Sequence, residues 1–214
     1  MSTLTLAYGR PTLADRIFSR KLVTDVVLVA AGAALVSLLA QLTIPLPYVP
    51  ITGQTLAVLL VGATLGATRG GISLALYAIL GLVGLPVYAP EDDGSHVTGL
   101  AALTGNSFGY ILGFILSAVL IGWLAQRQWE RKILGGLAAF AVGTLATFAI
   151  GLPWLAVWLT VNNAPDVAWT VFYWGFVVFI PGGIVKAAIG AGLIRLAWLG
   201  VKGADERARK ADAE

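Results

Sequence analysis

Long apolar runs alternate with short polar segments along most of the chain, a pattern that predicts helices crossing a membrane. Proline and glycine mark the turns, as at Pro86, because proline cannot continue a helix. The pattern predicts an all-α membrane protein, a compact bundle of six transmembrane helices. We expect the spans at residues 22–42, 55–67, 72–85, 108–125, 134–161 and 183–201.

The last apolar segment is the least regular. Residues 168–180 are apolar but too short to cross, and Pro181-Gly182-Gly183 interrupts the run before it resumes at Ile184. We therefore expect a broken or re-entrant segment, followed by a sixth helix that starts near Gly183. The stretch 51–54 should likewise dip into the membrane or line a cavity, since unpaired backbone in lipid is costly.

The charges outside the spans fall on one side of this topology. Cationic loops resist translocation, so both termini are predicted to be cytoplasmic. Residues 1–21 then form a cytoplasmic N-terminal segment, 22–201 a single transmembrane domain and 202–214 a charged cytoplasmic tail. Arg69-Gly70-Gly71 is expected to turn on the inner side. The other basic residues outside the spans are Arg10, Arg16, Arg20, Lys21, Arg127, Arg131, Lys132, Lys202, Arg207, Arg209 and Lys210.

Composition argues against catalysis. The chain is 58% hydrophobic and 12% charged, and it contains no cysteine. His96 is the single histidine, and Asp25 is the one acid predicted within a span. Intramembrane acid–base, metal or nucleophilic chemistry lacks its usual groups. We expect no catalytic residue, no metal site and no cofactor, and no phosphate-binding loop for ATP hydrolysis is present.

Lys186 is the strongest functional candidate. It lies inside the last span, where a charge is costly and is normally kept for function. If a half-helix begins near Gly183, its free N–H groups and the Lys186 amine together favour an anionic group such as a carboxylate. The alternative is a lysine satisfied by backbone carbonyls or by a carboxylate. Arg195, deeper in the same span, is expected to snorkel to the inner interface.

Polar and aromatic side chains predicted on the same outer half complete a candidate pocket. Together they supply donors and acceptors above an apolar cavity, a typical site for a small amphiphilic ligand. Trp154 and Trp158 are interpreted as interfacial anchors or as a wall of this cavity. The other candidates are Thr52, Gln54, Tyr88, Asp92, Asp93, Asn106, Ser107 and Tyr110.

Several strings, in order and spacing, resemble a known family. They are residues 49–60 (VPITGQTLAVLL), 81–89 (GLVGLPVYA), 105–114 (GNSFGYILGF) and 179–187 (FIPGGIVKA). The resemblance covers roughly residues 22–200. It is to the BioY family, the substrate-binding (S) components of energy-coupling-factor (ECF) biotin transporters.

The resemblance implies an outer-side pocket for biotin and a cytoplasmic energising module. That module consists of a transmembrane coupling protein and two ATPases, although some members of the family function without a dedicated one. Ala30 and Ala34 match an A-x-x-x-A face that docks the coupling protein. Lys186 falls on the lysine of the family's last helix, and on charge grounds we expect it to bind the valerate carboxylate.

One departure from the family concerns a ligand-binding acid. The family commonly has Asp at the position of Gly183, so one acceptor for a ureido N–H is missing. We hypothesise that Asp92 or Asp93, in the acidic outer loop, supplies it and pairs with Lys186 when the site is empty. The alternatives to biotin capture are an S component for another small anionic vitamin, a membrane enzyme using Lys186, and a structural subunit without a ligand.

Overall fold

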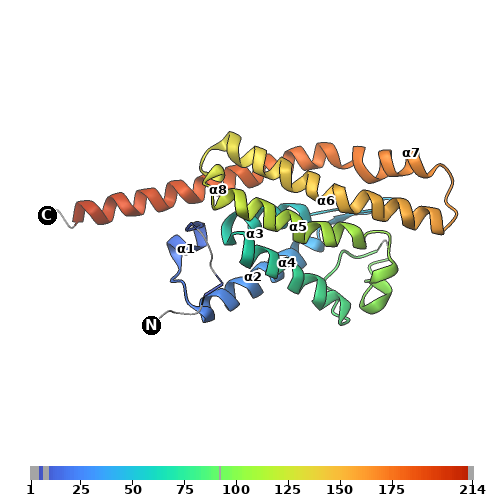
Figure 1. The fold of residues 1–214 in the computed structure, drawn as a ribbon, viewed down its shortest axis with the longest axis horizontal. Coiled ribbons are helices and arrows are strands. Elements are labelled where there is room, and N and C mark those ends of the chain that lie inside the picture. Colours follow the sequence, from blue (N-terminus) through green and yellow to red (C-terminus); the bar gives the residue numbers. More distant parts are fainter. Residues whose placement is uncertain (1–4, 7–9, 92, 212–214) are drawn as a thin grey trace.

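Apolar helices make up most of the structure, a computed structural model that describes residues 5–6, 10–91 and 93–211. Figure 1 shows them running side by side along the long axis. Short 3₁₀ helices at Gly99–Thr104 and Trp129–Arg131 join some of them. The α-helices are α1 (Leu13–Ile17), α2 (Leu22–Ala40), α3 (Gln54–Leu65), α4 (Ala67–Leu82), α5 (Phe108–Ala125), α6 (Ile133–Val161), α7 (Val167–Phe172) and α8 (Phe179–Ala211).

The expectation of an all-helical membrane protein with several apolar helices is confirmed. Within the described residues, four segments are long and apolar enough to cross a membrane: Leu22–Ala40, Phe108–Ala125, Ile133–Val161 and Val167–Ala211. Helices α3 and α4 are apolar but shorter. The predicted span 108–125 coincides with α5, and the predicted span 134–161 begins one residue inside α6.

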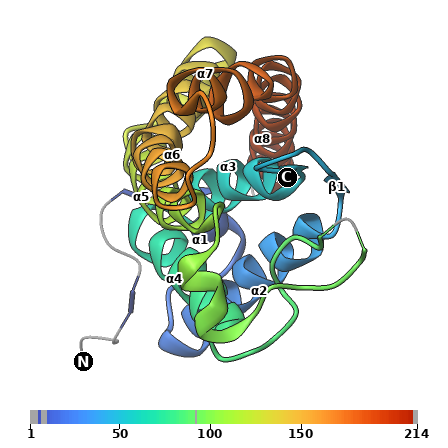
Figure 2. The ribbon, with the colours of Figure 1, turned by 90° about the vertical axis from the view of Figure 1, so that its right-hand side faces the viewer.

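Close packing around α5 holds the bundle together. A Cβ atom at Gly113 would lie 2.6 Å from the Thr147 carbonyl oxygen on α6, and one at Gly109 would lie 2.2 Å from Cβ of Trp154. Glycine at these positions lets the backbones approach, as in other membrane helix pairs. Viewed along the long axis, α2 and α4 lie on one side of the bundle, and α6, α7 and α8 on the other (Figure 2).

The predicted break at Pro181-Gly182-Gly183 is wrong, because α8 runs through it without interruption. Pro181 is the third residue of α8, in the first turn, where a missing N–H is tolerated. The irregularity lies earlier, where Tyr173–Val177 form a π-helical segment directly after α7. A wider turn just before proline removes the usual clash with the carbonyl four residues back.

The predicted inner turn at Arg69-Gly70-Gly71 is also wrong. Helix α4 already begins at Ala67, and the chain reverses at Gly66, whose φ of +85° suits glycine. Arg69 is therefore a helical residue, and its side chain is 2% exposed. A basic residue assigned to a loop is in fact part of the protein interior.

A two-stranded antiparallel pairing was not expected. Thr43–Ile44 (β1) pairs with Ile51–Thr52 (β2), with Thr43 opposite Thr52 and Ile44 opposite Ile51. The intervening residues include three prolines, which lack the N–H needed for further pairing. The pairing carries Thr52 to the start of α3, where it lines a cavity.

Both predicted terminal segments are at least partly structured. Leu13 and Ala14 of α1 are buried against the bundle, and α8 continues as a helix through the predicted tail to Ala211. Helix α1 and the C-terminal end of α8 lie at the same end of the molecule, on the left of Figure 1.

Candidate functional site

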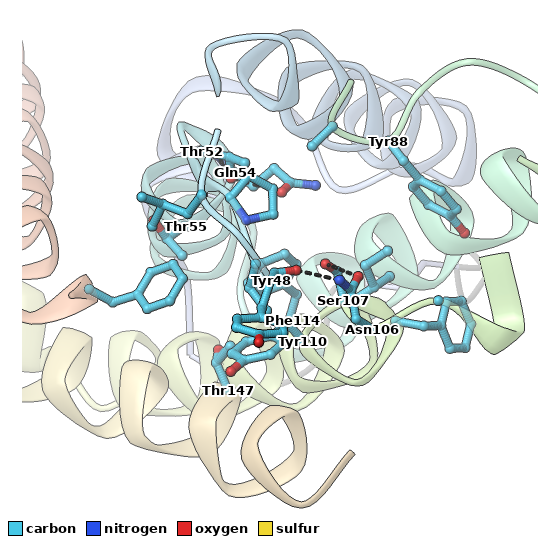
Figure 3. Close-up of a pocket in the computed structure, with 18 of the residues that line it drawn as sticks. Tyr48, Thr52, Gln54, Thr55, Tyr88, Asn106, Ser107, Tyr110, Phe114 and Thr147 are labelled. Carbon is cyan, nitrogen blue, oxygen red and sulfur yellow. Dashed lines mark hydrogen bonds between the residues drawn. The ribbon is translucent and has the colours of Figure 1, made fainter. Parts of the chain in front are cut away.

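A cavity of about 390 Å³ lies at the opposite end of the bundle from α1. Its polar lining includes residues from the segment between β1 and β2, the start of α3, the loop before α5, and helices α5 and α6 (Figure 3), together with Lys186 of α8. Most of the site candidates converge here. They are Thr52, Gln54, Tyr88, Asn106, Ser107, Tyr110, Gly183 and Lys186.

Lys186 reaches across the cavity from α8 to β2. Its Nζ donates a hydrogen bond of 2.7 Å to the carbonyl oxygen of Thr52. The ion pairs formed by the described residues include none to Lys186. An ammonium group has three donors, so the backbone carbonyl leaves hydrogen-bonding capacity for an anionic ligand.

The half-helix start predicted near Gly183, next to Lys186, is wrong, because α8 begins at Phe179. Lys186 is seven residues after Phe179, the first residue of α8. Lys186 therefore lies beyond the first turn of α8, whose N–H groups are the free ones. Lys186 is the one cationic side chain among the described residues that line the cavity.

Gln54 is held by two hydrogen bonds at the base of the cavity. Its Oε1 accepts from the Thr52 hydroxyl at 2.8 Å, and its Nε2 donates to the hydroxyl of Tyr77 on α4. Both ends of the amide are therefore oriented before any ligand arrives, as preorganised binding requires.

Thr55 is a lining residue that the sequence did not single out. Its hydroxyl is buried and has no hydrogen-bond partner among the described residues. A buried polar group without a partner costs free energy, so it is a natural contact for a ligand. A threonine in an apolar helix usually bonds its own backbone, as Thr147 does to Gly143 at 3.2 Å, and the sequence alone does not distinguish the two cases.

Asn106 and Ser107 form the polar wall opposite Gln54 (Figure 3). Asn106 Nδ2 donates to the carbonyl oxygen of Tyr48, and Asn106 Oδ1 accepts from the Ser107 hydroxyl at 3.0 Å. These bonds tie the loop before α5 to the proline-rich segment before β2. The Asn106 carboxamide retains a second N–H and a second acceptor lone pair.

Aromatic rings supply much of the apolar wall. The ring centroid of Phe148 lies 6.3 Å from that of Tyr110 and 6.0 Å from that of Phe179. The Tyr110 hydroxyl donates to the Gly175 carbonyl at 3.0 Å, which links the cavity to the π-helical segment. Packed aromatic walls of this kind suit a ligand with a ring or a hydrocarbon chain.

Tyr88 lines the cavity but is anchored in the protein. Its hydroxyl donates to the Ala78 carbonyl at 2.6 Å, and its backbone carbonyl lies 2.9 Å from Nδ1 of His96. Burial raises the pKa of Tyr88 to about 12, so its hydroxyl stays neutral at physiological pH. A Cβ atom at Gly81 would lie 2.1 Å from this ring, so glycine is needed there to admit it.

The predicted acids occupy different positions. Asp92 lies outside the described residues. Asp93 does not line the cavity. Hydrogen bonds from the Ser95 hydroxyl and from the Ser95 N–H, the latter at 2.9 Å, lower the pKa of Asp93. The neighbouring Glu91 does line the cavity. In the part of the chain that the structure describes, no three acidic, His or Cys side chains gather as a metal site.

Two other candidates are resolved by the geometry. Trp154 donates to the Gly105 carbonyl at 2.9 Å without lining the cavity, whereas Trp158 lines it and donates to the Thr104 carbonyl at 2.9 Å. Gly183 lines the cavity, and a Cβ atom there would meet no atom within 4 Å. The position that departs from the family pattern thus has room for a side chain.

Ala30 and Ala34 lie far from this cavity, on an exposed face of α2. The same face carries exposed Val23, Val26 and Val27. A flat strip of small residues between larger apolar ones allows close approach of another helix. The structure leaves this strip uncovered, and docking on it stays a prediction.

Comparison with known proteins gives a consistent result. The BioY family model matches residues 10–203. The "Biotin transporter BioY2" of Lactococcus lactis subsp. cremoris is 34% identical over 173 residues, 78% of this chain and 88% of that protein. The "Biotin transporter BioY" of Rhizobium etli is 31% identical over 186 residues, 82% of this chain and 94% of that protein.

A solved structure has the same fold. It is the crystal structure of the S-component for biotin from an ECF-type ABC transporter. The TM-score is 0.68, with 26% sequence identity over 81% of this chain and 89% of that one. The similarity extends over nearly the whole bundle described above.

Proposed function

The chain belongs to the BioY family, and on that premise we propose that it captures biotin as the S component of an ECF transporter. It is a transport protein and not an enzyme. The observation that carries the proposal is the Lys186 amine, bound at 2.7 Å to a single backbone carbonyl inside a cavity of about 390 Å³. That size falls in the roughly 300–1,000 Å³ range of small-ligand pockets.

We propose that the valerate carboxylate binds Lys186. A carboxylate is the one charged group of biotin, and a charge-assisted hydrogen bond to a partly desolvated ammonium is strong. The ureido ring would then face the polar wall of Asn106 and Ser107, with the unpartnered Thr55 hydroxyl available to it. The sulfur-containing ring and the chain would pack on the aromatic residues.

The family's missing acid needs a substitute in this arrangement. We propose Glu91 as the acceptor for a ureido N–H, because it lines the cavity whereas Asp93 is bonded to Ser95. Asp92 stays an alternative for this role. Neither assignment requires the acid to pair with Lys186. The Glu91 contact can be tested independently of the Lys186 contact, because it concerns the opposite end of the ligand.

We propose six spans with both termini cytoplasmic. Helices α2, α3, α4, α5 and α6 would supply five, and the near-continuous run from α7 to α8 the sixth. The shared end of α1 and α8 supports this, as do the basic residues gathered at that end. The cavity then faces outward. Ala30 and Ala34 would dock the coupling protein, and two cytoplasmic ATPases would supply the energy that this chain lacks.

Binding of biotin and of its neutral amide to the purified protein tests the proposal. Wild type should bind biotin saturably and the amide about tenfold or more weakly, since one charge-assisted bond is worth roughly 1.5–3 kcal/mol. In Lys186→Ala, both ligands should bind with equal, lower affinity. Lys202→Ala, which removes an exposed charge from the other end, is the control.

Three outcomes contradict parts of this proposal. Equal affinity of wild type for both ligands means that Lys186 does not bind the carboxylate. Absence of biotin binding, with saturable binding of another anionic vitamin, supports the alternative substrate. Absence of binding by any such ligand rules out the capture function.

A further inference from the structure

A second hollow, of about 690 Å³, lies at the end of the bundle that carries α1. It is bounded by the start of α4, the end of α5 and the residues around the 3₁₀ helix Trp129–Arg131. Neither the biotin cavity nor the exposed strip on α2 contributes to it. The lining residues are Arg10, Ala67, Thr68, Trp123, Gln126, Arg127 and Trp129.

Two cations, Arg10 and Arg127, line this hollow. Among the residues that the structure describes, neither Arg10 nor Arg127 forms an ion pair. The Arg127 guanidinium instead stacks 3.3 Å from the ring centroid of Trp123. Such stacking orients a guanidinium and leaves its N–H groups free along the edge.

The segment that carries Arg10 is anchored at Thr12 by the buried ion network of Arg69. Thr12, two residues later, is 1% exposed, and its hydroxyl accepts from Arg69 Nη2 at 3.2 Å. Its methyl group lies 2.9 Å from where a Cβ atom of Gly66 would be. The chain carrying Arg10 is thus fixed against the turn between α3 and α4.

The floor of the hollow is rigid as well. A Cβ atom at Gly122 would lie 2.3 Å from the backbone nitrogen of Ala67, so α5 packs directly on the first residue of α4. The rim is different, because Trp123 is 48% and Trp129 is 43% exposed. Half-exposed tryptophans at the end of apolar helices are typical of the membrane–water boundary.

From these features we infer that the hollow binds the phosphate-bearing headgroup of an anionic phospholipid. Two guanidinium groups match phosphate oxygens in geometry and charge. Basic pockets between helices at the cytoplasmic face are a common setting for lipid headgroups. The tryptophans place the pocket at headgroup depth, where the lipid's acyl chains can lie along α5. Under the proposed topology, the lipid belongs to the inner leaflet.

Lipid retained by the purified protein tests this inference. Wild type and Arg10→Gln/Arg127→Gln are placed in nanodiscs containing equal amounts of phosphatidylglycerol and phosphatidylcholine, then extracted and analysed by native mass spectrometry. Wild type should retain phosphatidylglycerol preferentially. This preference should fall about fivefold for each cation removed, and therefore roughly 25-fold in the double variant.

Matched variants separate the site from net charge and from misfolding. Lys202→Gln/Arg209→Gln removes the same charge from exposed positions of α8 and should keep the preference. Arg10→Lys/Arg127→Lys keeps the charge without the guanidinium geometry and should recover only part of it. Biotin affinity should be unchanged in all of them, which also shows that each is folded.

Two results would overturn the inference. One is an equal loss of preference in the α8 control, which would mean diffuse attraction to the membrane. The other is an unchanged preference in Arg10→Gln/Arg127→Gln. Adding inorganic phosphate distinguishes the sources of the same chemistry: if free phosphate displaces the lipid completely at millimolar concentration, the site recognises phosphate and not a lipid.

Discussion

Arg69 and Lys186 are two cations within apolar helices, and their surroundings differ completely. Arg69, which is 2% exposed, bonds to Asp15 at 2.7 Å and Asp25 at 3.2 Å. It also donates to the Leu65 carbonyl at 3.0 Å. Lys186 is half-buried, and its one hydrogen bond within the described residues is to the Thr52 carbonyl. Arg69 uses four of its five N–H donors within its own chain and pairs with two carboxylates, whereas Lys186 has donors left over for a ligand.

The contrast separates a structural charge from a functional one. Removing one member of a buried ion pair leaves the other charge buried and unpaired, which lowers the stability of the fold. Removing a cation that lacks a carboxylate partner leaves no such orphan. The two residues should therefore respond oppositely when stability and ligand affinity are measured side by side.

The largest effect is expected for Arg69→Met. The substitution leaves Asp25 buried without the cation that pairs with it and leaves Asp15 paired with Arg20 alone, which should cost about 3–5 kcal/mol of stability. Thermal unfolding in detergent measures the loss. Arg16→Met, which removes an exposed pair with Asp205, is the control and should cost less than about 1 kcal/mol. Equal losses in the two variants would show that the Arg69 network contributes no more than a surface pair.

Lys186→Met should show the reverse pattern. Biotin affinity should fall roughly 10- to 100-fold, the value of a charge-assisted hydrogen bond of about 1.5–3 kcal/mol. The free energy of unfolding of the empty protein should change by less than about 1 kcal/mol, because no buried carboxylate loses its partner. Calorimetric titration and thermal unfolding of the same preparation measure both. A large loss of stability without ligand would place Lys186 in the same structural class as Arg69.

Thr55→Val tests the other unused donor in the cavity. Valine has nearly the same shape, and the hydroxyl it replaces is buried without a partner. The empty protein should be as stable as wild type or slightly more stable, while biotin affinity should fall about fivefold. Thr64→Val is the control, since its hydroxyl bonds the Leu60 carbonyl at 2.7 Å outside the cavity. An unchanged affinity in Thr55→Val would remove this contact from the proposed site.

The smallest effect concerns the acid side of the Arg69 network. Burial raises the pKa of Asp15, but hydrogen bonds from Arg20 and Thr12 and the charge of Arg69 outweigh it and leave the pKa below 3.8. A lowered pKa stabilises the folded protein above the unfolded value, and this contribution is lost as pH falls through the folded value. Thermal stability should therefore decline below about pH 4. Asp15→Asn should be less stable at neutral pH and should decline less steeply in acid.

An exposed carboxylate provides the comparison for that experiment. Asp205→Asn removes the partner of Arg16 on the surface. It should leave the acid limb of the stability profile nearly unchanged, because a surface pair contributes little. A profile of Asp15→Asn that parallels wild type below pH 4 would assign the acid sensitivity to other groups.

Some features of this protein could be predicted because they are properties of neighbouring residues. Apolar runs of sufficient length define α2, α5 and α6 almost to the residue. Lys186 stands out for the same reason, since a charge within an apolar run is visible in the sequence. The family strings identify most of the cavity's lining, because they include Gln54, Asn106 and Tyr110.

The wrong predictions concern where a helix breaks and where the chain reverses, and both depend on local backbone geometry. Pro181 suggested a break, but a π-helical segment at Tyr173–Val177 accommodates it within a continuous path. Arg69 was assigned to a loop because glycines follow it, yet the turn lies at Gly66. Neither the width of one helical turn nor the position of one positive φ follows from hydropathy.

The sequence by itself determined that this chain is a helical membrane protein of the BioY family, because span length and local strings are encoded along the chain. The tertiary structure alone decided which charges are paired. Arg69 meets Asp25 across 44 residues and Asp15 across 54, while Lys186 meets a backbone carbonyl 134 residues away. Ion pairing depends on distances of a few ångströms between side chains from separate helices, and packing of the whole bundle sets those distances.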